Sequence, residues 1–176
     1  MKTSVYIATS LDGFIARTNG DVDWLGGPPE EGEDYGFARF FESVDALVMG
    51  RNTFEMIQSF GEWPYGSKPV FVLTSRPLEL PEDVAKHVES MSCFPEKLVE
   101  RLSQKGMKHI YVDGGKTIQG FLEAGLIQHI IITRIPILIG KGIPLFGPLK
   151  QDIKLRHIET KVFPNGLEQS EYEVAA

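Results

Sequence analysis

Two short segments place glycine, a cation and threonine directly after an apolar, strand-like run. The residues concerned are Gly50, Arg51 and Thr53 in the first segment, and Gly114, Gly115, Lys116 and Thr117 in the second. A strand that ends in glycine lets the backbone come close to a ligand. A helix that follows directs unpaired N–H groups and the positive end of its dipole towards an anion such as phosphate. The two segments together predict that a polyanionic ligand is held at two places.

Size and composition favour a single globular domain with a sizeable core. The 176 residues are 42% hydrophobic and 24% charged, which is ordinary for such a domain. The net charge of −6 argues against general binding to nucleic acid or to an anionic membrane, because both require a basic surface. A small anionic ligand stays possible, because local cations can outweigh the average charge.

The rare residue types set further limits. Cys93 is the only cysteine, which excludes an intrachain disulfide and a cysteine metal cluster. The four histidines show no metal-ligand spacing, and we expect no metal site. The apolar run at the N-terminus is too short for a signal peptide, and no apolar run reaches membrane-spanning length. We therefore expect a cytoplasmic protein.

Strand-like and helix-like segments alternate along the chain, which predicts an α/β fold around a mostly parallel sheet. We expect strands at residues 4–8, 14–16, 46–49, 70–73, 84–88, 109–112 and 127–135. We expect helices that begin near residue 34 and that span residues 53–60, 95–102 and 117–124. Residues 20–33 should form a long loop. Residues 154–162 and 167–174 predict a terminal β-hairpin, which would make the sheet mixed.

Five segments occur in order over nearly the whole chain: residues 10–16, 49–53, 74–76, 113–116 and 136–146. With these segments the chain resembles the dihydrofolate reductase superfamily. Within it, the chain is most similar to stand-alone relatives of the reductase (RibD C-terminal) domain of bacterial riboflavin biosynthesis. The resemblance implies a three-layer αβα fold over residues 1–176, with a mixed sheet that is mostly parallel. It also implies an NADPH-dependent reductase that forms a homodimer.

The resemblance assigns cofactor roles to the glycine turns. Gly50, Arg51 and Thr53 would hold the pyrophosphate, and Ala8 would present backbone groups to the carboxamide. In the family, the pair that matches Gly114 and Gly115 is joined by a cis peptide bond beside the nicotinamide, and Lys116 and Thr117 would complete this turn. The alternative is that both segments are only tight strand-to-helix turns.

A third segment follows the strand expected at residues 70–73. Thr74, Ser75 and Arg76 offer two hydroxyl groups and a guanidinium, which suit the 2′-phosphate of a ribose. Alone, the segment could equally be a turn that ends the strand beside Pro77. With the two glycine turns it favours NADPH over NADH, which has no phosphate there.

Three further residues are candidates for substrate contact. The family's folate-reducing members carry a catalytic acid at the position of Asp34, although aspartate is also a preferred N-cap of a helix. Asp12 matches a stretch that lines the substrate site in riboflavin-type reductases, or is simply part of a turn. Trp24 lies where the family has a mobile lid, or packs on the core as a loop aromatic.

Lys68 departs from the folate enzymes, which usually have arginine at this place to grip a carboxylate with two parallel hydrogen bonds. Lysine cannot make that planar fork, which lowers the case for a dihydrofolate reductase. The sequence therefore predicts a reductase of a pyrimidine- or pteridine-type C=N bond, resembling 5-amino-6-(5-phosphoribosylamino)uracil reductase. The alternatives are a dihydrofolate reductase, a nucleotide-binding protein without catalysis, and a homodimer that binds a small regulator.

Overall fold

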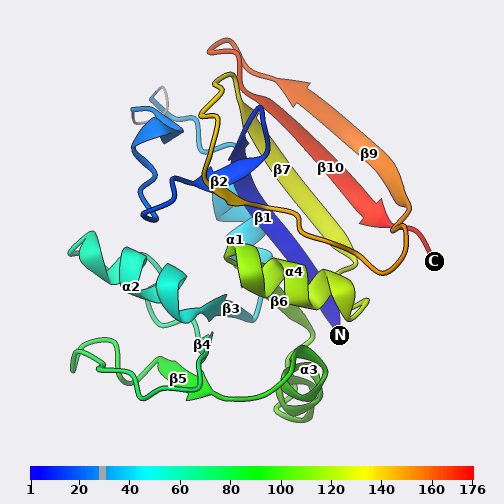
Figure 1. Cartoon of the computed structure of the whole chain (residues 1–176). Helices are drawn as coiled ribbons and strands as arrows, with labels where there is room; N and C mark the ends of the chain where they lie inside the picture. Colours follow the sequence, from blue (N-terminus) through cyan, green and yellow to red (C-terminus); the bar gives the residue numbers. More distant parts are fainter. Residues whose placement is uncertain (28–30) are drawn as a thin grey trace.

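In a computed structural model of the chain, an eight-stranded sheet with helices on both faces is the central element (Figure 1). The structure describes residues 1–27 and 31–176. The strands are β1 (Lys2–Ser10), β2 (Phe14–Ala16), β3 (Ala46–Gly50), β4 (Val70–Leu73), β5 (Val88–Met91), β6 (His109–Asp113), β7 (His129–Ile135), β8 (Ile143–Pro144), β9 (Leu155–Val162) and β10 (Glu168–Val174). The helices are the 3-10 helix η1 (Asp23–Leu25), α1 (Phe37–Ser43), α2 (Arg51–Ser59), α3 (Pro95–Gln104) and α4 (Gly115–Glu123).

The strand order is β5-β4-β3-β6-β1-β7-β10-β9. The six strands from β5 to β7 are parallel, and β10 and β9 add to β7 as an antiparallel hairpin. This hairpin, orange to red in Figure 1, forms one edge of the sheet. The mixed sheet and the terminal hairpin predicted from the sequence are confirmed.

Two hydrophobic cores lie on opposite faces of the sheet because side chains alternate along a strand. Leu47 and Met49 of β3 pack with Phe40 of α1 and Phe54 of α2. Ala46 and Val48 face the other core, which contains Leu98 and Leu102 of α3 and Phe121 of α4. Helices α1 and α2 therefore cover one face, and α3 and α4 cover the other. The three-layer arrangement predicted from the resemblance is confirmed.

The strand expected at residues 84–88 is wrong. Only Val88 begins a strand, β5, which continues to Met91. The preceding residues form turns in which Val84 N–H and Ala85 N–H donate to Pro81 O, and His87 N–H donates to Val84 O. The buried side chains of Val84 and Val88 resemble a strand pattern, but local hydrogen bonds coil the backbone between them.

Several boundaries differ from the expected ones. Helices α2 and α4 begin at Arg51 and Gly115, two residues before the ranges expected from hydrophobic spacing. The first residues of both helices belong to the strand-to-helix turn, and their types suit a turn better than they suit a helix. Strand β7 begins at His129 because the residues before it close α4, with Leu126 N–H donating to Phe121 O. A short antiparallel pair, β2 with β8, includes a strand at residues 143–144 that the sequence analysis did not predict. No helix in the described part of the chain is long and apolar enough to cross a membrane.

Phe54 tests the core between α2 and the sheet. Its side chain is fully buried, whereas Phe60, just after the same helix, is 60% exposed. We expect Phe54→Ala to lower the free energy of unfolding by about 3–5 kcal/mol, because it removes buried surface and leaves a cavity. Phe60→Ala should change it by about 0.5 kcal/mol or less. Urea denaturation of both variants measures the difference, and equal losses would contradict this assignment of the core.

Candidate functional site

The candidate cofactor residues lie at the carboxyl ends of four neighbouring parallel strands. Thr74 to Arg76 follow β4, Gly50 ends β3, Gly114 follows β6, and Ala8 lies near the end of β1. The strand order β4-β3-β6-β1 places these groups side by side over about 14 Å, given the usual spacing between strands. In open α/β sheets this edge is where ligands bind.

The turns after β3 and β6 pack against each other reciprocally. Met49 pairs with Asp113, so the glycines that follow them are neighbours. A Cβ atom on Gly50 would lie 2.9 Å from Thr117 Oγ1, and one on Gly114 would lie 2.5 Å from Thr53 Oγ1. Each threonine thus fills the space that the glycine of the other turn leaves open. The arrangement brings the N-termini of α2 and α4, with both hydroxyl groups, to one place.

The backbone of these two turns offers hydrogen-bond donors. The geometry of an α-helix leaves the first N–H groups of α2 and α4 without an intrahelical acceptor. In α4 the first helical bond runs from Ile118 N–H to Gly114 O, at 2.8 Å. The N–H groups of Gly115, Lys116 and Thr117 therefore precede it and are suited to an anion. The structure thus brings together the two segments that the sequence singled out.

The peptide bond between Gly114 and Gly115 is trans, so the cis bond expected from the resemblance is wrong for this structure. Gly114 makes the turn with a φ of +95°, a conformation that other residues rarely adopt. Gly115 is buried, and a Cβ atom there would lie 3.0 Å from Ile15 Cδ1 and 3.1 Å from Pro144 O. Both positions require glycine for different reasons: the first for its conformation and the second for space.

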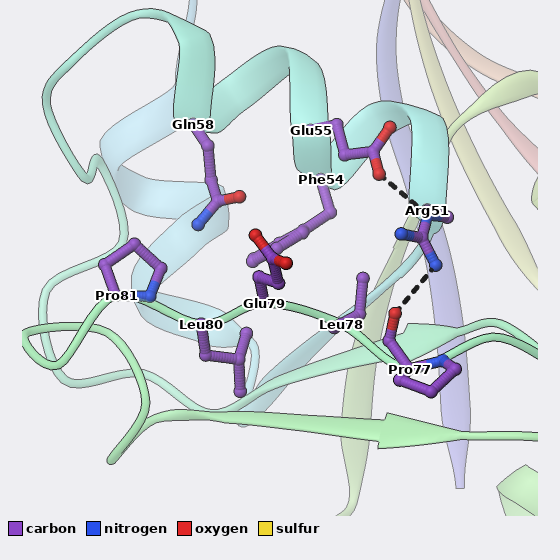
Figure 2. A pocket seen from close by; sticks show the side chains of 9 residues that line it. All are labelled: Arg51, Phe54, Glu55, Gln58, Pro77, Leu78, Glu79, Leu80 and Pro81. Atoms are coloured by element: carbon purple, nitrogen blue, oxygen red, sulfur yellow. Dashed lines mark hydrogen bonds and ion pairs between the residues drawn. The ribbon is translucent and has the colours of Figure 1, made fainter.

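Arg51 uses its guanidinium to order the protein. Its Nε donates to Glu55 Oε1 at 2.7 Å and its Nη1 to Pro77 O at 3.0 Å (Figure 2). The side chain thereby ties the turn after β4 to helix α2. A cavity of about 630 Å³ lies between α2 and residues 77–81, with Phe54 among its lining residues. Arg51 is predicted from the sequence to face a phosphate, whereas these contacts show a structural use of its charge.

The turn after β4 presents Ser75 and Arg76 to solvent. Thr74 Oγ1 accepts the N–H of Arg76 at 3.2 Å, so this hydroxyl shapes the turn. The side chains of Ser75 and Arg76 are exposed, and Arg76 forms no ion pair with the residues described. Lys116 in the first turn of α4 is also exposed. These are the polar side chains best placed to meet a ligand's phosphate groups.

Asp34 lies two residues before Gly36, which is the N-cap residue of helix α1 (Phe37–Ser43). Its Oδ1 accepts the N–H of Gly36 at 2.9 Å and its Oδ2 the N–H of Ala38 at 3.0 Å. The hydrogen bonds from Ala38 and Gly36 lower the pKa of Asp34 below its usual value, because they favour the ionised form. The exposed carboxyl group is therefore ionised at neutral pH. The expected N-cap position is therefore wrong, because Gly36 occupies it. The Asp34 carboxylate instead bonds to the N–H groups of Gly36 and of Ala38 in the first turn, and its spare lone pairs can still accept a further hydrogen bond.

A polar network beside Asp34 was not predicted from the sequence. Tyr6 OH donates to Tyr35 O at 2.7 Å, and Gln169 Nε2 donates to the same oxygen at 3.0 Å and to Thr133 Oγ1 at 2.9 Å. Burial, with smaller effects of nearby groups that include Asp34, raises the pKa of Tyr6 to about 12. The network joins β1, β7 and β10 to the start of α1. Only the register Gln169 to Thr133 brings these residues together, and this register is not readable from local patterns.

Asp12 lies directly after β1, and Trp24 lies in the 3-10 helix η1, after β2. The Oδ2 of Asp12 accepts the N–H of Gly140 at 2.8 Å, and a hydrogen bond from Ser10, aided by those from Gly140 and Ile139, lowers the pKa of Asp12. Asp12 thus holds the segment after β7.

Trp24 is 5% exposed, and its Nε1 has no hydrogen-bond partner among the described residues. A buried donor of this kind is costly and is available to a ligand or water. Part of the predicted loop, residues 28–30, lies outside the described residues.

Lys68 is committed to the protein backbone. Its Nζ donates to Phe41 O at 2.6 Å and to Val44 O, and it lies 4.5 Å from the centre of the Phe41 ring. The ammonium group therefore satisfies carbonyls at the C-terminal end of α1, where a cation is favourable. It is not directed at a substrate carboxylate.

The N-termini of α2 and α4 offer backbone donors at the carboxyl ends of β3 and β6, a geometry suited to an anion. The described residues contain no group of three or more His, Cys, Asp or Glu side chains that could hold a metal ion. The donor set of helix N-termini, hydroxyl groups and exposed cations fits a dinucleotide better than it fits a metal.

Two close relatives extend over almost the full chain. The Bacillus subtilis (strain 168) protein named "Uncharacterized protein YwjB" is 37% identical over 164 residues, which covers 92% of each chain. The crystal structure of a putative riboflavin biosynthesis protein from Shewanella sp. PV-4 is 43% identical. It superposes with a TM-score of 0.93 and covers 100% of both chains.

A more distant structure shares the fold. Dihydrofolate reductase from Enterococcus faecalis, in complex with NADP(H) and RAB-propyl, has a TM-score of 0.68 at 17% identity, over 99% of this chain and 97% of that one. The family model of the RibD C-terminal domain matches residues 2–168. With the sheet, the hairpin and the paired glycine turns in place, the chain belongs to the RibD C-terminal domain family and has a dihydrofolate reductase-like fold.

Proposed function

We propose that this protein is an NADPH-dependent reductase that acts on a C=N bond of a pyrimidine- or pteridine-type heterocycle. The observation that carries the proposal is the convergence of two helix N-termini, those of α2 and α4, through the reciprocal packing of Gly50, Thr53, Gly114 and Thr117. Membership of the RibD C-terminal domain family and the fold shared with an NADP(H)-bound dihydrofolate reductase support a dinucleotide as the anion.

The residues present fit this cofactor. The N-termini of α2 and α4 would hold the pyrophosphate, with the hydroxyl groups of Thr53 and Thr117 as additional donors. Ser75 and Arg76 would meet the 2′-phosphate at the end of β4, and Thr74 would shape the turn that presents them, because its hydroxyl bonds to the backbone of Arg76. The cofactor supplies the hydride, and the protein supplies binding and orientation.

Asp34 would orient the substrate in its ionised form. Because hydrogen bonds from α1 keep its pKa low, Asp34 suits the role of acceptor for a ring N–H better than that of proton donor. Its attachment to α1, and the tie between Tyr35 and Gln169, hold it in a fixed place. Lys68 is occupied by carbonyl groups, which disfavours a folate with a carboxylate tail.

We further propose, from the family resemblance, that the protein works in the cytoplasm as a homodimer.

A nucleotide-binding protein without turnover is the second candidate. One observation favours it: both carboxylate oxygens of Asp34 accept backbone N–H groups, and its side chain is exposed. If Asp34 only stabilised the start of α1, the site would lack the side chain proposed to act on the substrate.

Calorimetric titration with NADPH and NADH, followed by an assay of NADPH oxidation, separates these candidates. The reductase proposal expects tight binding of NADPH, weaker binding of NADH, and oxidation in the presence of a phosphoribosylaminopyrimidine or a dihydropteridine. Binding without oxidation of NADPH by any member of such a panel would favour the second candidate. Absence of binding to both nucleotides would reject the cofactor site.

Gly114→Ala tests the paired turns. The new methyl group would collide with Thr53 Oγ1 in a backbone conformation unfavourable for alanine, with strain of about 1–3 kcal/mol. We expect NADPH affinity to fall at least about tenfold, because the displaced turn carries the donors. Gly120→Ala, in the same helix, is the control, since its nearest contact would be 3.8 Å away. If both variants bind NADPH like the wild type, the turn does not form the cofactor site.

Arg76→Ala tests the selectivity for a phosphorylated ribose. We expect NADPH to bind about 10–100-fold more weakly, as for the loss of a charge-assisted hydrogen bond, while NADH affinity stays the same. Arg101→Ala on α3 should change neither affinity. Equal losses for the two nucleotides would reject the 2′-phosphate assignment, and calorimetry on all three proteins gives the values.

Asp34→Asn tests the substrate side. We expect unchanged NADPH affinity and a kcat that falls by up to about 100-fold, because the variant loses the charge that orients the ring. Glu33→Gln is the matched control: Glu33 also accepts a backbone N–H, that of Tyr35, and its neutralisation should leave turnover near the wild-type value. Unchanged turnover in Asp34→Asn would leave Asp34 with only its structural role at the start of α1.

A further inference from the structure

Asp113 stands directly behind the turn that begins α4. It is the last residue of β6, and its Oδ1 accepts the N–H of Gly114 at 2.8 Å. This bond engages the first amide of the turn and fixes the residue whose φ is +95°. The side chain of Asp113 therefore helps to set the direction in which the following N–H groups point.

Among the residues that the structure describes, no cation pairs with Asp113. Asp113 is half-buried, and burial of its carboxyl group raises its pKa to about 6, against a smaller lowering effect of the bond from Gly114. The phenols of Tyr65 and Tyr111 lie close enough to interact with it: burial raises the pKa of both, and the charge of Asp113 adds a smaller effect in the same direction. Of the cations at the adjacent helix starts, Arg51 is paired with Glu55 and Lys116 is exposed.

We propose that Asp113 couples proton binding to cofactor binding: its hydrogen bond holds Gly114 in both protonation states, and its negative charge, when present, opposes the anion at the paired helix N-termini. The inference rests on the proposed function, because the anion is the cofactor's pyrophosphate. Asp113 acts through Gly114 and through its charge, and is therefore a positioning residue.

The direction of the pH dependence follows from linkage. An anion bound near a carboxylate favours the protonated form, so the pKa of Asp113 is higher in the complex than in the free protein. Below about pH 6 Asp113 is protonated in both, and the affinity is greatest. As pH rises through this value the free protein loses its proton first, and the affinity falls until the complex also ionises. Each unit of difference between the two pKa values weakens binding about tenfold.

The experiment compares the wild type with Asp113→Asn in calorimetric titrations with NADP⁺ between pH 5.5 and 8.5 at constant ionic strength. The asparagine oxygen can accept the same N–H of Gly114 but carries no charge. Phosphate monoesters titrate near pH 6 themselves, so the difference between the two proteins is the measure. We expect equal affinities at pH 5.5 and about tenfold tighter binding by Asp113→Asn at pH 8.5.

Asp45→Asn is the matched control. The Asp45 carboxylate also accepts backbone N–H groups, those of Lys108 and His109, but at the opposite end of β3 and β6. It should follow the wild type at every pH. Parallel curves for the wild type and Asp113→Asn overturn the inference and leave the cofactor proposal intact. Failure of the wild type to bind NADP⁺ at any pH overturns both.

A measurement on the wild type alone covers the case in which Asp113→Asn does not fold. The phosphates of NAD⁺ titrate far below pH 5, so calorimetry of NAD⁺ binding in buffers of different ionisation enthalpy reports protons taken up by the protein. We expect net proton uptake near pH 7. Zero uptake across pH 6–8 contradicts a role for Asp113 in binding.

Discussion

The mutual packing of two strand-to-helix turns is the constraint on which the site depends. β3 and β6 are parallel neighbours in register, so the helices that follow them start side by side, and each threonine occupies the space beside the other turn's glycine. Two helix N-termini close together bring partial positive charges together. This arrangement is electrostatically unfavourable by itself and becomes favourable when an anion lies between them. The same geometry that positions the donors would therefore give the proposed site its preference for negative charge.

The segment after β7 forms a second part of the frame. It returns across the first turn of the chain, where Leu11 N–H donates to Ile137 O and the Asp12 carboxylate accepts the N–H groups of Ile139 and Gly140. It then packs on α4, where Ile143 and Pro144 lie against Gly115 together with Ile15 of β2. The N-terminus of α4 is thus held by β6, which precedes it in the chain, and by residues distant in sequence. A rigid frame of this kind reduces the ordering cost of binding a flexible dinucleotide.

The sequence predicts the parts of this fold that are specified locally. The central strands are apolar runs that end in glycine or in Thr-Ser-Arg, and these signals place β3, β4 and β6 nearly to the residue. Local patterns also misled, as at Val84, whose burial comes from turns rather than from a strand. The Arg51–Glu55 pair is local, at i,i+4 on one helix, whereas the contact of Arg51 with Pro77 O and the partners of Lys68 and Gln169 depend on which strands become neighbours. No spacing along the chain encodes them, so these contacts become visible only in three dimensions.

The distribution of charge separates residues that build the site from residues that face a ligand. Arg51, Lys68 and Asp12 all have types that suit ligand recognition, and the structure shows each of them bound to backbone carbonyl or N–H groups. Arg76 and Lys116 stay exposed at the same edge. Most of the remaining donors are backbone N–H groups, which every residue except proline supplies. In the proposed reductase, recognition of the pyrophosphate would therefore depend less on side-chain identity than on the glycines that set the backbone. Discrimination between phosphorylated and unphosphorylated ribose would depend on a few exposed side chains after β4.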